Sequence, residues 1–589
     1  MGTVPVVTFF SEKGVDNSFD MFYIEYTFSE QQFNEQQFNE QVEDINMTKR
    51  TNATYASTSN AASNISTTSA NASTITSTTN NSTPNKVIVI GGGVAGLSAG
   101  IYALLAGFEV EIYEKNAIPG GECIGWNRKG FHIDNCIHWL TGTRKGTEMY
   151  DVWKTTGALS DDMEYAKIDA FYTSTYKGQS VTLWNDLKRT ERELIAAAPE
   201  DEEEIRKFIQ YVEYSKQCLF PANKPMEMWR IKDYISMGKS MADFPKVMKE
   251  FGKISLEDYS KRFKSPLLQR MICDYLPKTY CAYSFLVSYA TMADGNGNIP
   301  MGASMQMSRR MEKRFKELGG KICYNKGAEK IVVEKKVATG VKFEDGTFVR
   351  ADYVIPTVDT HLLFGKLLSE DYMPKKMRAA YDAPKDYPVT SGFQVAFAVS
   401  ESFSCGETVF IDVDTLRVGA TDADRMYVKP YGYDPIFVKD GRQVIQTCIT
   451  QGHDDFAYWK SLSKDEYRRE KERLVKEVEE RIERAFPELK GGLEFLDAWT
   501  PLTYERYCNA FHGSYMSFIT TPAGKAVRMK GRLKGVRNLY VAGQWTNSPG
   551  GLPVAAASGK FAVQRIQKSL KRSIDLGPEN VPAYIWQEG

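Results

Sequence analysis

The residues with the clearest chemistry in this chain are three glycines in the hexapeptide Gly91-Gly92-Gly93-Val94-Ala95-Gly96. Their spacing, G-x-G-x-x-G, is typical of turns that bind a dinucleotide. Gly91 permits a tight turn, Gly93 lets the backbone approach a pyrophosphate, and Gly96 lets a helix pack closely against a strand. Glu114 follows about 20 residues later, where a carboxylate can accept hydrogen bonds from a ribose. These residues predict a bound dinucleotide but do not distinguish NAD, NADP and FAD.

The flanking sequence supplies the elements that such a turn requires. Val87–Ile90 is a short run of β-branched residues, which predicts a strand. Leu97–Leu105 is rich in small apolar residues, which predicts a helix ended by Gly107, and Glu109–Tyr113 predicts a second strand. The helix N-terminus would carry free N–H groups and a partial positive charge that suit a phosphate. A strand, turn and helix without a ligand is the alternative, and the presence of Glu114 after the second strand favours the dinucleotide.

Composition limits the class of protein. The chain has 589 residues, enough for two or three domains, and a net charge of zero, which gives no argument for nucleic acid as a partner. Its nine cysteines form no C-x-x-C pair and its five histidines no pair with metal-ligand spacing, so we expect neither a dithiol centre nor a metal site. No apolar run reaches about 18 residues, so no transmembrane helix is expected. Scattered cysteines in odd number favour a reducing compartment, and we expect a cytoplasmic protein.

The rest of the chain divides by composition. Polar repeats rich in Gln, Asn, Ser and Thr fill residues 1–85, which predicts disorder because such a segment cannot bury enough apolar surface to offset its chain entropy. Residues 166–296 look mostly helical, and the aromatic and Met residues of Trp229–Phe251 predict an apolar interior or pocket wall. Residues 366–524 mix strands with an amphipathic helix, Ser463–Phe486, that begins with a capping box. The nucleotide-domain pattern occupies three parts, 86–165, 297–365 and 525–572, and a short tail, 573–589, follows.

A second glycine turn lies near the C-terminus. Leu539–Ala542 predicts a buried strand that ends at Gly543-Gln544, and Gly550–Pro553 leads into a predicted helix, Val554–Leu570. A further pair of glycines, in Pro119-Gly120-Gly121, comes directly after the first unit. The helix N-terminus that follows the second turn would stabilise a negative charge placed beside it.

In this order, these motifs resemble FAD-dependent oxidoreductases of the phytoene desaturase type, a group that includes carotenoid isomerases and retinol saturases. The chain is more distantly similar to flavin amine oxidases. The resemblance covers about residues 86–570. It implies an α/β fold, in which a discontinuous, Rossmann-like FAD-binding domain of the glutathione-reductase kind carries a mixed α+β substrate domain built from the two long insertions.

The resemblance also implies cofactor contacts residue by residue. The first glycine turn would hold the pyrophosphate, and the second would meet the ribityl chain and the flavin ring, where a helix N-terminus would stabilise reduced flavin. The residues implied are Gly91, Gly93, Val94, Ala95 and Gly96 at the pyrophosphate, Glu114 with Lys115 at the ribose, Gly120 and Gly121 near the diphosphate and flavin, Ala328 at the adenine, Gly543 and Gln544 at the diphosphate and ribityl chain, and Leu552, Pro553 and Val554 at the flavin ring.

Two positions depart from the pattern of these families. Glu122 occupies the position of a common arginine after the paired glycines, and Gln544 occupies the position of a common acid after the C-terminal glycine. Both changes weaken the expected contacts with phosphate or ribityl groups.

The resemblance implies redox chemistry at a carbon–carbon bond of a long apolar substrate related to carotenoids, retinoids or isoprenoids. Hydride transfer would occur at the flavin N5 atom, as desaturation or saturation. In this group the chemistry rests largely on the flavin, so the resemblance leaves open whether an acid/base residue takes part. The first candidates for one are His512, Tyr515 and His138. A purely structural histidine is an equal alternative for His512.

Other hypotheses remain open from the sequence. They are a flavin amine oxidase, a non-redox isomerase that needs reduced FAD, and a flavoprotein that only binds or scaffolds. The electron partner would be external, either oxygen, a quinone or NAD(P), because no second G-x-G-x-x-G unit occurs. An apolar substrate partitions into lipid, which predicts a peripheral membrane contact, and the basic residues of the last helix are one candidate surface: Lys560, Arg565, Lys568, Lys571 and Arg572.

Overall fold

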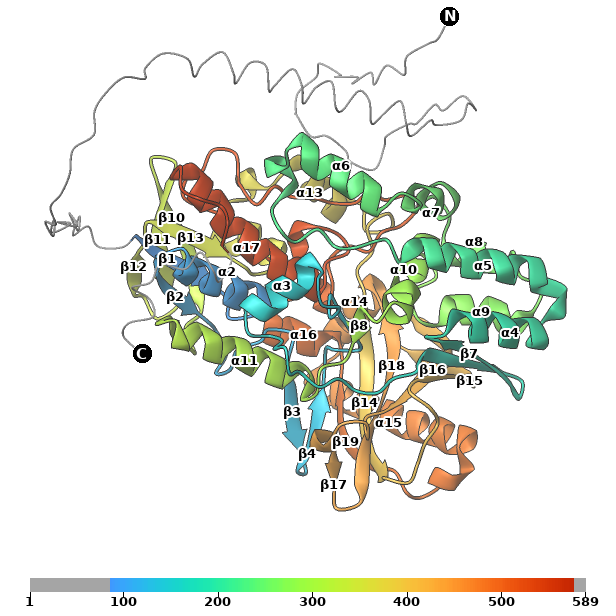
Figure 1. Cartoon of the computed structure of the whole chain (residues 1–589). Coiled ribbons are helices and arrows are strands. Elements are labelled where there is room, and N and C mark those ends of the chain that lie inside the picture. The colour runs from blue at the N-terminus through green and yellow to red at the C-terminus, as the bar shows by residue number, and fades with distance from the viewer. Residues whose placement is uncertain (1–84, 577–589) are drawn as a thin grey trace, which may run out of the picture. The chain divides into compact units, whose positions relative to one another are not determined.

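The computed structural model describes residues 85–576 of the chain. Four parallel strands form a nucleotide-binding sheet in the order β13 (Tyr353–Pro356), β1 (Lys86–Ile90), β2 (Glu109–Tyr113) and β9 (Lys321–Cys323) (Figure 1). The predicted strands β1 and β2 are confirmed. β1 is almost fully buried, which explains its continuous apolar run, because helices cover the faces of parallel sheets. The predicted disordered tail lies, except for residue 85, outside the described residues.

Three helices that are far apart in sequence pack beside this sheet. They are α2 (Val94–Leu105), α11 (Ala303–Glu317) and α17 (Leu552–Ser569). Figure 1 shows α2 and α17 side by side, and Ser98 Oγ on α2 donates a 2.7 Å hydrogen bond to the carbonyl oxygen of Ala556 on α17. The two helices that follow the two glycine turns are therefore direct neighbours.

A second, larger sheet runs through the two insertions. Most of its neighbouring strands are antiparallel, and β6 and β15 are parallel. In sheet order the strands are β19 (Glu494–Trp499), β14 (Ser391–Ser400), β18 (Arg442–Gln451), β16 (Thr421–Pro430), β15 (Val409–Val418), β6 (Ala170–Tyr176) and β7 (Gln179–Trp184), and β17 (Val438–Lys439) pairs with β18.

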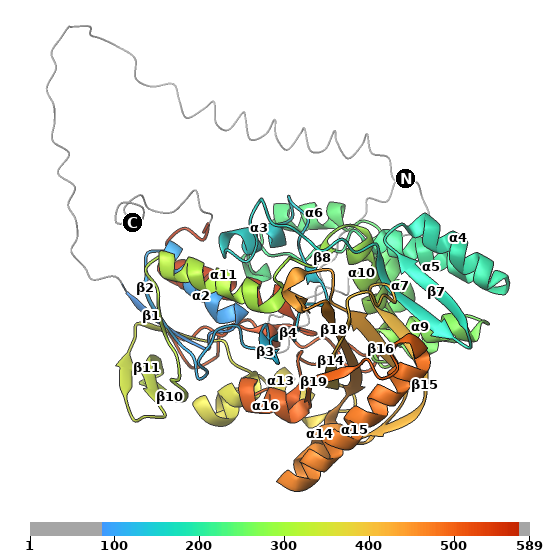
Figure 2. The same ribbon diagram turned by 90° about the horizontal axis from the view of Figure 1, so that it is seen from below.

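Strands β6 and β7 belong to residues 166–296, the segment whose composition looks mostly helical. The pairing of β6 with β15 joins this segment to residues 366–524, so one sheet serves both insertions. The predicted helix Ser463–Phe486 is confirmed as α15 (Lys464–Ala485), and Ser463 and Glu466 form its capping box. Figure 2 shows α15 lying along β15, and its apolar stripe packs on the sheet.

Leu539–Ala542 is buried as predicted, but it does not form a regular strand. It makes an isolated parallel bridge between Leu539 and Val354 of β13. Within residues 85–576, no helix is long and apolar enough to cross a membrane.

The remaining helices and strands have the following bounds. Among the helices they are α3 (Glu148–Thr155), α4 (Leu187–Ala197), α5 (Glu202–Ser215), α6 (Ile231–Ser240), α7 (Phe244–Phe251), α8 (Leu256–Ser260), α9 (Pro266–Asp274), α10 (Ala282–Ala293), α12 (Thr360–Leu362), α13 (Lys375–Asp382), α14 (His453–Ser461) and α16 (Pro501–Cys508). Among the strands they are β3 (Gly125–Arg128), β4 (Phe131–Asp134), β5 (Leu140–Thr141), β8 (Gly297–Asn298), β10 (Ala328–Glu334), β11 (Val337–Phe343) and β12 (Phe348–Arg350).

Candidate flavin site

A cavity of about 1080 Å³ connects the two glycine turns with the large sheet. It is larger than ordinary small-ligand pockets, which suits a dinucleotide together with a substrate. Most of the residues implied as cofactor contacts share its wall. Those that line it are Gly91, Gly93, Val94, Ala95, Glu114, Lys115, Gly120, Gly121, Ala328, Gly543, Gln544, Leu552 and Pro553. Gly96 and Val554 do not line it.

The first turn presents backbone donors to this cavity. Gly93 caps α2 without a side-chain hydrogen bond, so the N–H groups of the first helical turn have no side-chain acceptor. Free N–H groups at a helix N-terminus fit a diphosphate. Gly96 acts through packing, because a Cβ atom there would lie 1.9 Å from the carbonyl oxygen of Gly91.

Glu114 fastens the first turn to the end of β2. Its Oε2 atom accepts a 2.7 Å hydrogen bond from the Gly92 N–H, and its Oε1 atom accepts a 2.8 Å bond from the Asn116 N–H. The carboxylate therefore orders the glycine turn as well as lining the cavity. The neighbouring Lys115 donates a hydrogen bond from its ammonium group to the carbonyl oxygen of Arg506, which belongs to α16.

The second turn presents another uncapped helix N-terminus. Gly551, at φ +85°, precedes Leu552 and Pro553, and no side chain caps α17. The Gly551 N–H donates a 3.1 Å hydrogen bond to Oε1 of Gln544, which holds the turn against the end of the Leu539–Ala542 segment. The positive end of α17 thus faces the cavity, where it fits a ligand group that gains negative charge.

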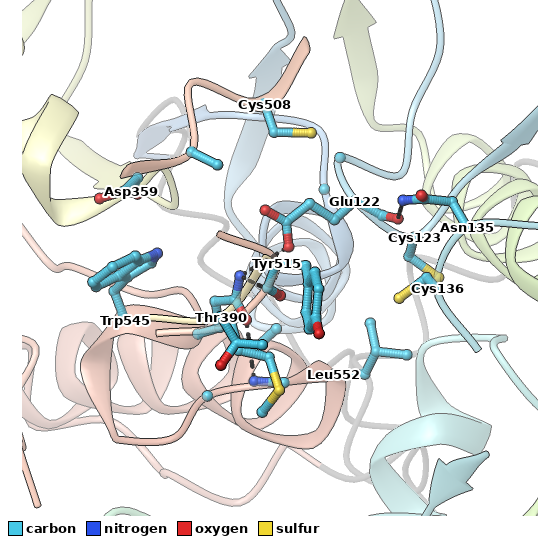
Figure 3. Close-up of a pocket in the computed structure, with 18 of the residues that line it drawn as sticks. Glu122, Cys123, Asn135, Cys136, Asp359, Thr390, Cys508, Tyr515, Trp545 and Leu552 are labelled. Atoms are coloured by element: carbon cyan, nitrogen blue, oxygen red, sulfur yellow. Dashed lines mark hydrogen bonds between the residues drawn. The ribbon is translucent and has the colours of Figure 1, made fainter. Parts of the chain in front are cut away.

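Glu122 and Gln544, the two positions that depart from the family pattern, contact each other. The Gln544 amide donates a 3.0 Å hydrogen bond to Oε2 of Glu122 (Figure 3). No salt bridge to Glu122 occurs among the described residues. Removal from bulk water raises the pKa of Glu122 to about 8, the nearby Asp359 adds to the rise, and the Gln544 hydrogen bond opposes it. The cavity therefore contains a carboxyl group that carries a proton at neutral pH.

Glu122→Gln should remove a pH dependence of stability. The wild-type folded state holds a proton that the unfolded chain releases at its ordinary pKa of 4.5, so wild-type stability falls as the pH rises from 4.5 to about 8. The glutamine variant should lack this loss and gain stability relative to wild type across that window, by roughly 1.4 kcal/mol for each pKa unit of the shift, or several kcal/mol in all. Thermal unfolding of both proteins in the same flavin state, at a series of pH values, measures the difference. Parallel pH profiles would contradict it.

The three proton-transfer candidates separate in space. Tyr515 and His138 line the cavity, and His512 does not. Burial raises the pKa of Tyr515 far above its ordinary value, which leaves a phenol that can donate a hydrogen bond. Burial, and then the charge of Lys429, lower the pKa of His138 to about 3, which leaves a neutral imidazole.

His512 belongs to a histidine cluster instead. Its Nδ1 atom lies 2.6 Å from Nδ1 of His453, and its ring stacks on Phe511 and Phe456. Burial, together with the charges of His453 and His361, lowers the pKa of His512 to about 4. His512 was a proton-transfer candidate from the sequence, but the chain turns its side chain toward α14.

Sequence patterns gave no signal for one wall of the cavity. Trp139, Tyr275, Phe410 and Tyr427 come from four separate segments and line it together. Successive ring centroids lie 5.5 Å apart from Trp139 to Tyr275, 5.9 Å from Tyr275 to Phe410 and 5.6 Å from Phe410 to Tyr427. Edge and tilted contacts of this kind stabilise a continuous apolar surface.

The chain matches two protein-family models and is similar to several known proteins. The model of the family described as flavin containing amine oxidoreductase matches residues 94–567, and that of the alanine dehydrogenase/PNT C-terminal domain matches residues 57–119. Prolycopene isomerase of Daucus carota is 24% identical over 502 residues, covering 82% of this chain and 80% of its own. The 4,4'-diaponeurosporene oxygenase of Staphylococcus aureus strain MW2 is 21% identical over 519 residues, covering 82% and 97%. A solved putrescine oxidase bound to putrescine shares the fold, with a TM-score of 0.51, 13% identity and coverage of 83% and 99%.

Proposed function

Because the chain belongs to the family of flavin containing amine oxidoreductases and is an FAD-dependent oxidoreductase, we propose that it acts on a carbon–carbon bond of a long apolar substrate of the carotenoid, retinoid or isoprenoid kind. FAD, when bound, would accept or donate a hydride at N5. The observation that carries this proposal is the aromatic wall of Trp139, Tyr275, Phe410 and Tyr427, which continues the cavity beyond the glycine turns.

The proposed contacts with FAD follow from the donors in the wall. Val94 and Ala95, at the α2 N-terminus, would hold the diphosphate, and Leu552 and Pro553, at the α17 N-terminus, would meet the flavin. Glu122, which carries a proton, would add no negative charge beside the diphosphate.

Neither of the proton-transfer candidates that line the cavity is a charged base, although charged side chains, among them Asp424, Arg425 and Lys278, also line it. Tyr515 and His138 are both neutral there, for the reasons given above. Their role in this proposal is to exclude water and to position the polyene by contact. The names of the two curated relatives, which are those of carotenoid-modifying enzymes, support a polyene.

Isomerisation without net electron transfer is the second candidate, and the named isomerase among the relatives favours it. Amine oxidation is the third, and the putrescine oxidase likeness supports only the fold. We further propose an external electron partner, either oxygen, a quinone or NAD(P), and a cytoplasmic location.

One experiment separates these candidates. Protein loaded with oxidised FAD, and a second sample in which the FAD has been reduced with dithionite, are incubated without oxygen with acyclic polyenes of several saturation levels, or with a diamine. The products are separated by chromatography and their masses are measured. The proposal expects a polyene that gains or loses two hydrogen atoms, with a matching change in flavin absorbance. A polyene of altered retention and unchanged mass would indicate isomerisation, and oxidation of the diamine alone would overturn the proposal.

A variant of the aromatic wall completes this test. Phe410→Asp introduces a charge into the wall and should lower polyene turnover at least about tenfold, because burying an unpaired carboxylate is unfavourable. FAD content should stay unchanged, since Phe410 comes from β15 and not from the glycine turns. Unchanged polyene turnover in this variant would contradict the assignment of the wall.

A further inference from the structure

Helix α6 (Ile231–Ser240) has an unusual environment for a helix of a folded protein. None of its residues is buried, and no helix or strand within residues 85–576 packs extensively against it. Figure 1 shows it at the periphery, on the side away from the strands β14 and β18. The aromatic and Met residues of this region predicted an apolar interior, and that prediction holds for Phe244 and Phe251 of α7 but not for α6.

The exposed face of α6 is apolar. Ile231 is 80% exposed, Ile235 50% and Tyr234 44%. Their spacing, i, i+3 and i+4, places these side chains on one face of the helix. Large apolar side chains exposed singly are ordinary, whereas a contiguous set marks an interaction surface.

Basic residues flank this face. Lys232 and Lys239 are exposed, and neither forms a salt bridge within the described part of the chain. The acid of this helix, Asp233, is instead paired with Lys224 at 2.8 Å. α6 therefore presents an apolar stripe whose adjacent unpaired charges are positive.

We propose that α6 docks the protein on an anionic lipid bilayer, lying in the interface with Ile231, Tyr234 and Ile235 among the acyl chains and with Lys232 and Lys239 at the headgroups. A short helix with one apolar face and lysines at its border is typical of interfacial binding. The stems of the lysines can lie along the apolar layer while their ammonium groups reach the headgroups. This inference rests on the surface of α6 and stands whatever the substrate is.

This surface is separate from the one expected from the sequence, which lies on α17. Arg565 on α17 is 8% exposed and pairs with Glu227 at 2.7 Å, just before α6, so it is not available to a membrane. α17 is largely buried against α2. Arg565 is thus not part of an exposed basic surface and instead anchors the segment that precedes α6, whereas Lys568, Lys571 and Arg572, at or just beyond the end of α17, are exposed.

Flotation with lipid vesicles tests the proposal on the full-length, FAD-loaded protein. Wild type should float with vesicles of phosphatidylcholine mixed with phosphatidylserine, and less with phosphatidylcholine alone or at high salt. Ile231→Ser/Ile235→Ser should reduce the bound fraction at least about tenfold on both vesicles. Lys232→Gln/Lys239→Gln should reduce it on the anionic vesicles alone.

A matched control is Phe348→Ser, which removes a side chain that is 51% exposed on β12, far from α6 in sequence. It should float as wild type does. Circular dichroism and flavin content should be unchanged in all variants, since α6 lines no part of the cavity. The proposal is overturned if wild type floats with neither vesicle, if the isoleucine variant floats like wild type, or if α6 mediates a dimer in light scattering that the isoleucine variant abolishes.

Discussion

Gly96→Ala should yield protein that no longer retains FAD. The added Cβ atom would lie 1.9 Å from the carbonyl oxygen of Gly91, and neither group can rotate away because both belong to the backbone. α2 must then shift from β1, and the N–H groups that it presents to the cavity shift with it. We expect FAD affinity to fall at least 100-fold, or by about 2.7 kcal/mol. The flavin-to-protein ratio after purification, followed by FAD titration, measures the loss.

The matched control is Gly365→Ala, in the π-helical turn after α12, where an added Cβ atom meets no atom within 4 Å. This variant should keep its flavin, since it changes a glycine without closing a contact. Far-UV circular dichroism reports whether Gly96→Ala is folded. Stoichiometric FAD in folded Gly96→Ala protein would contradict the packing role of Gly96.

Glu114→Ala should weaken FAD binding by about 10- to 100-fold. It removes the two hydrogen bonds from Gly92 and Asn116 that hold the glycine turn, and hydrogen bonds to a charged group contribute about 1.5–3 kcal/mol each. The FAD affinity of Glu114→Gln should lie between those of wild type and Glu114→Ala. The amide oxygen can still accept one of the two backbone hydrogen bonds, but the amide NH2 group faces the other backbone N–H donor. Flavin fluorescence titration of the flavin-free proteins measures the three affinities.

Glu344→Ala is the control for this series. Glu344 lines the same cavity, but its carboxylate pairs with exposed Lys366 on the surface, and such pairs contribute little. Its FAD affinity should stay within about threefold of wild type. If Glu344→Ala and Glu114→Ala lost affinity equally, the specific role of Glu114 in ordering the turn would be wrong.

Local patterns predicted the parts of this fold that depend on neighbouring residues. β1, α2 and β2 follow from a β-branched run, a small-residue helix and a second strand, and their contacts lie within one short unit. Both glycine turns were located in this way, because each needs a backbone geometry that few other residues allow.

Features set by distant contacts were not predicted. β6 finds its parallel partner β15 more than 200 residues later in the chain, and nothing within Ala170–Tyr176 identifies that partner. The aromatic wall of the cavity has the same origin, since its four rings come from four segments. Burial is also non-local: the apolar residues of α6 resemble those of a core helix, and only the absence of a packing partner distinguishes them.

The contact between Glu122 and Gln544 was not predicted from the sequence, although both positions were noted there. Each departs from the family pattern, and from the sequence each looked like a separate loss of a contact to the cofactor. The structure places them within 3.0 Å of one another, so the two changes form one hydrogen-bonded pair. The pairing depends on the first and second glycine turns meeting at one cavity, which spacing alone does not show.

The central claim is that the two glycine turns hold FAD between them. The most direct measurement is the visible absorbance spectrum of the purified full-length protein, with identification of the chromophore released on denaturation. We expect a flavin spectrum, close to one FAD released per chain, and restoration of that spectrum when FAD is added to stripped wild-type protein but not to Gly96→Ala. A colourless, folded protein that takes up no FAD on addition would contradict it.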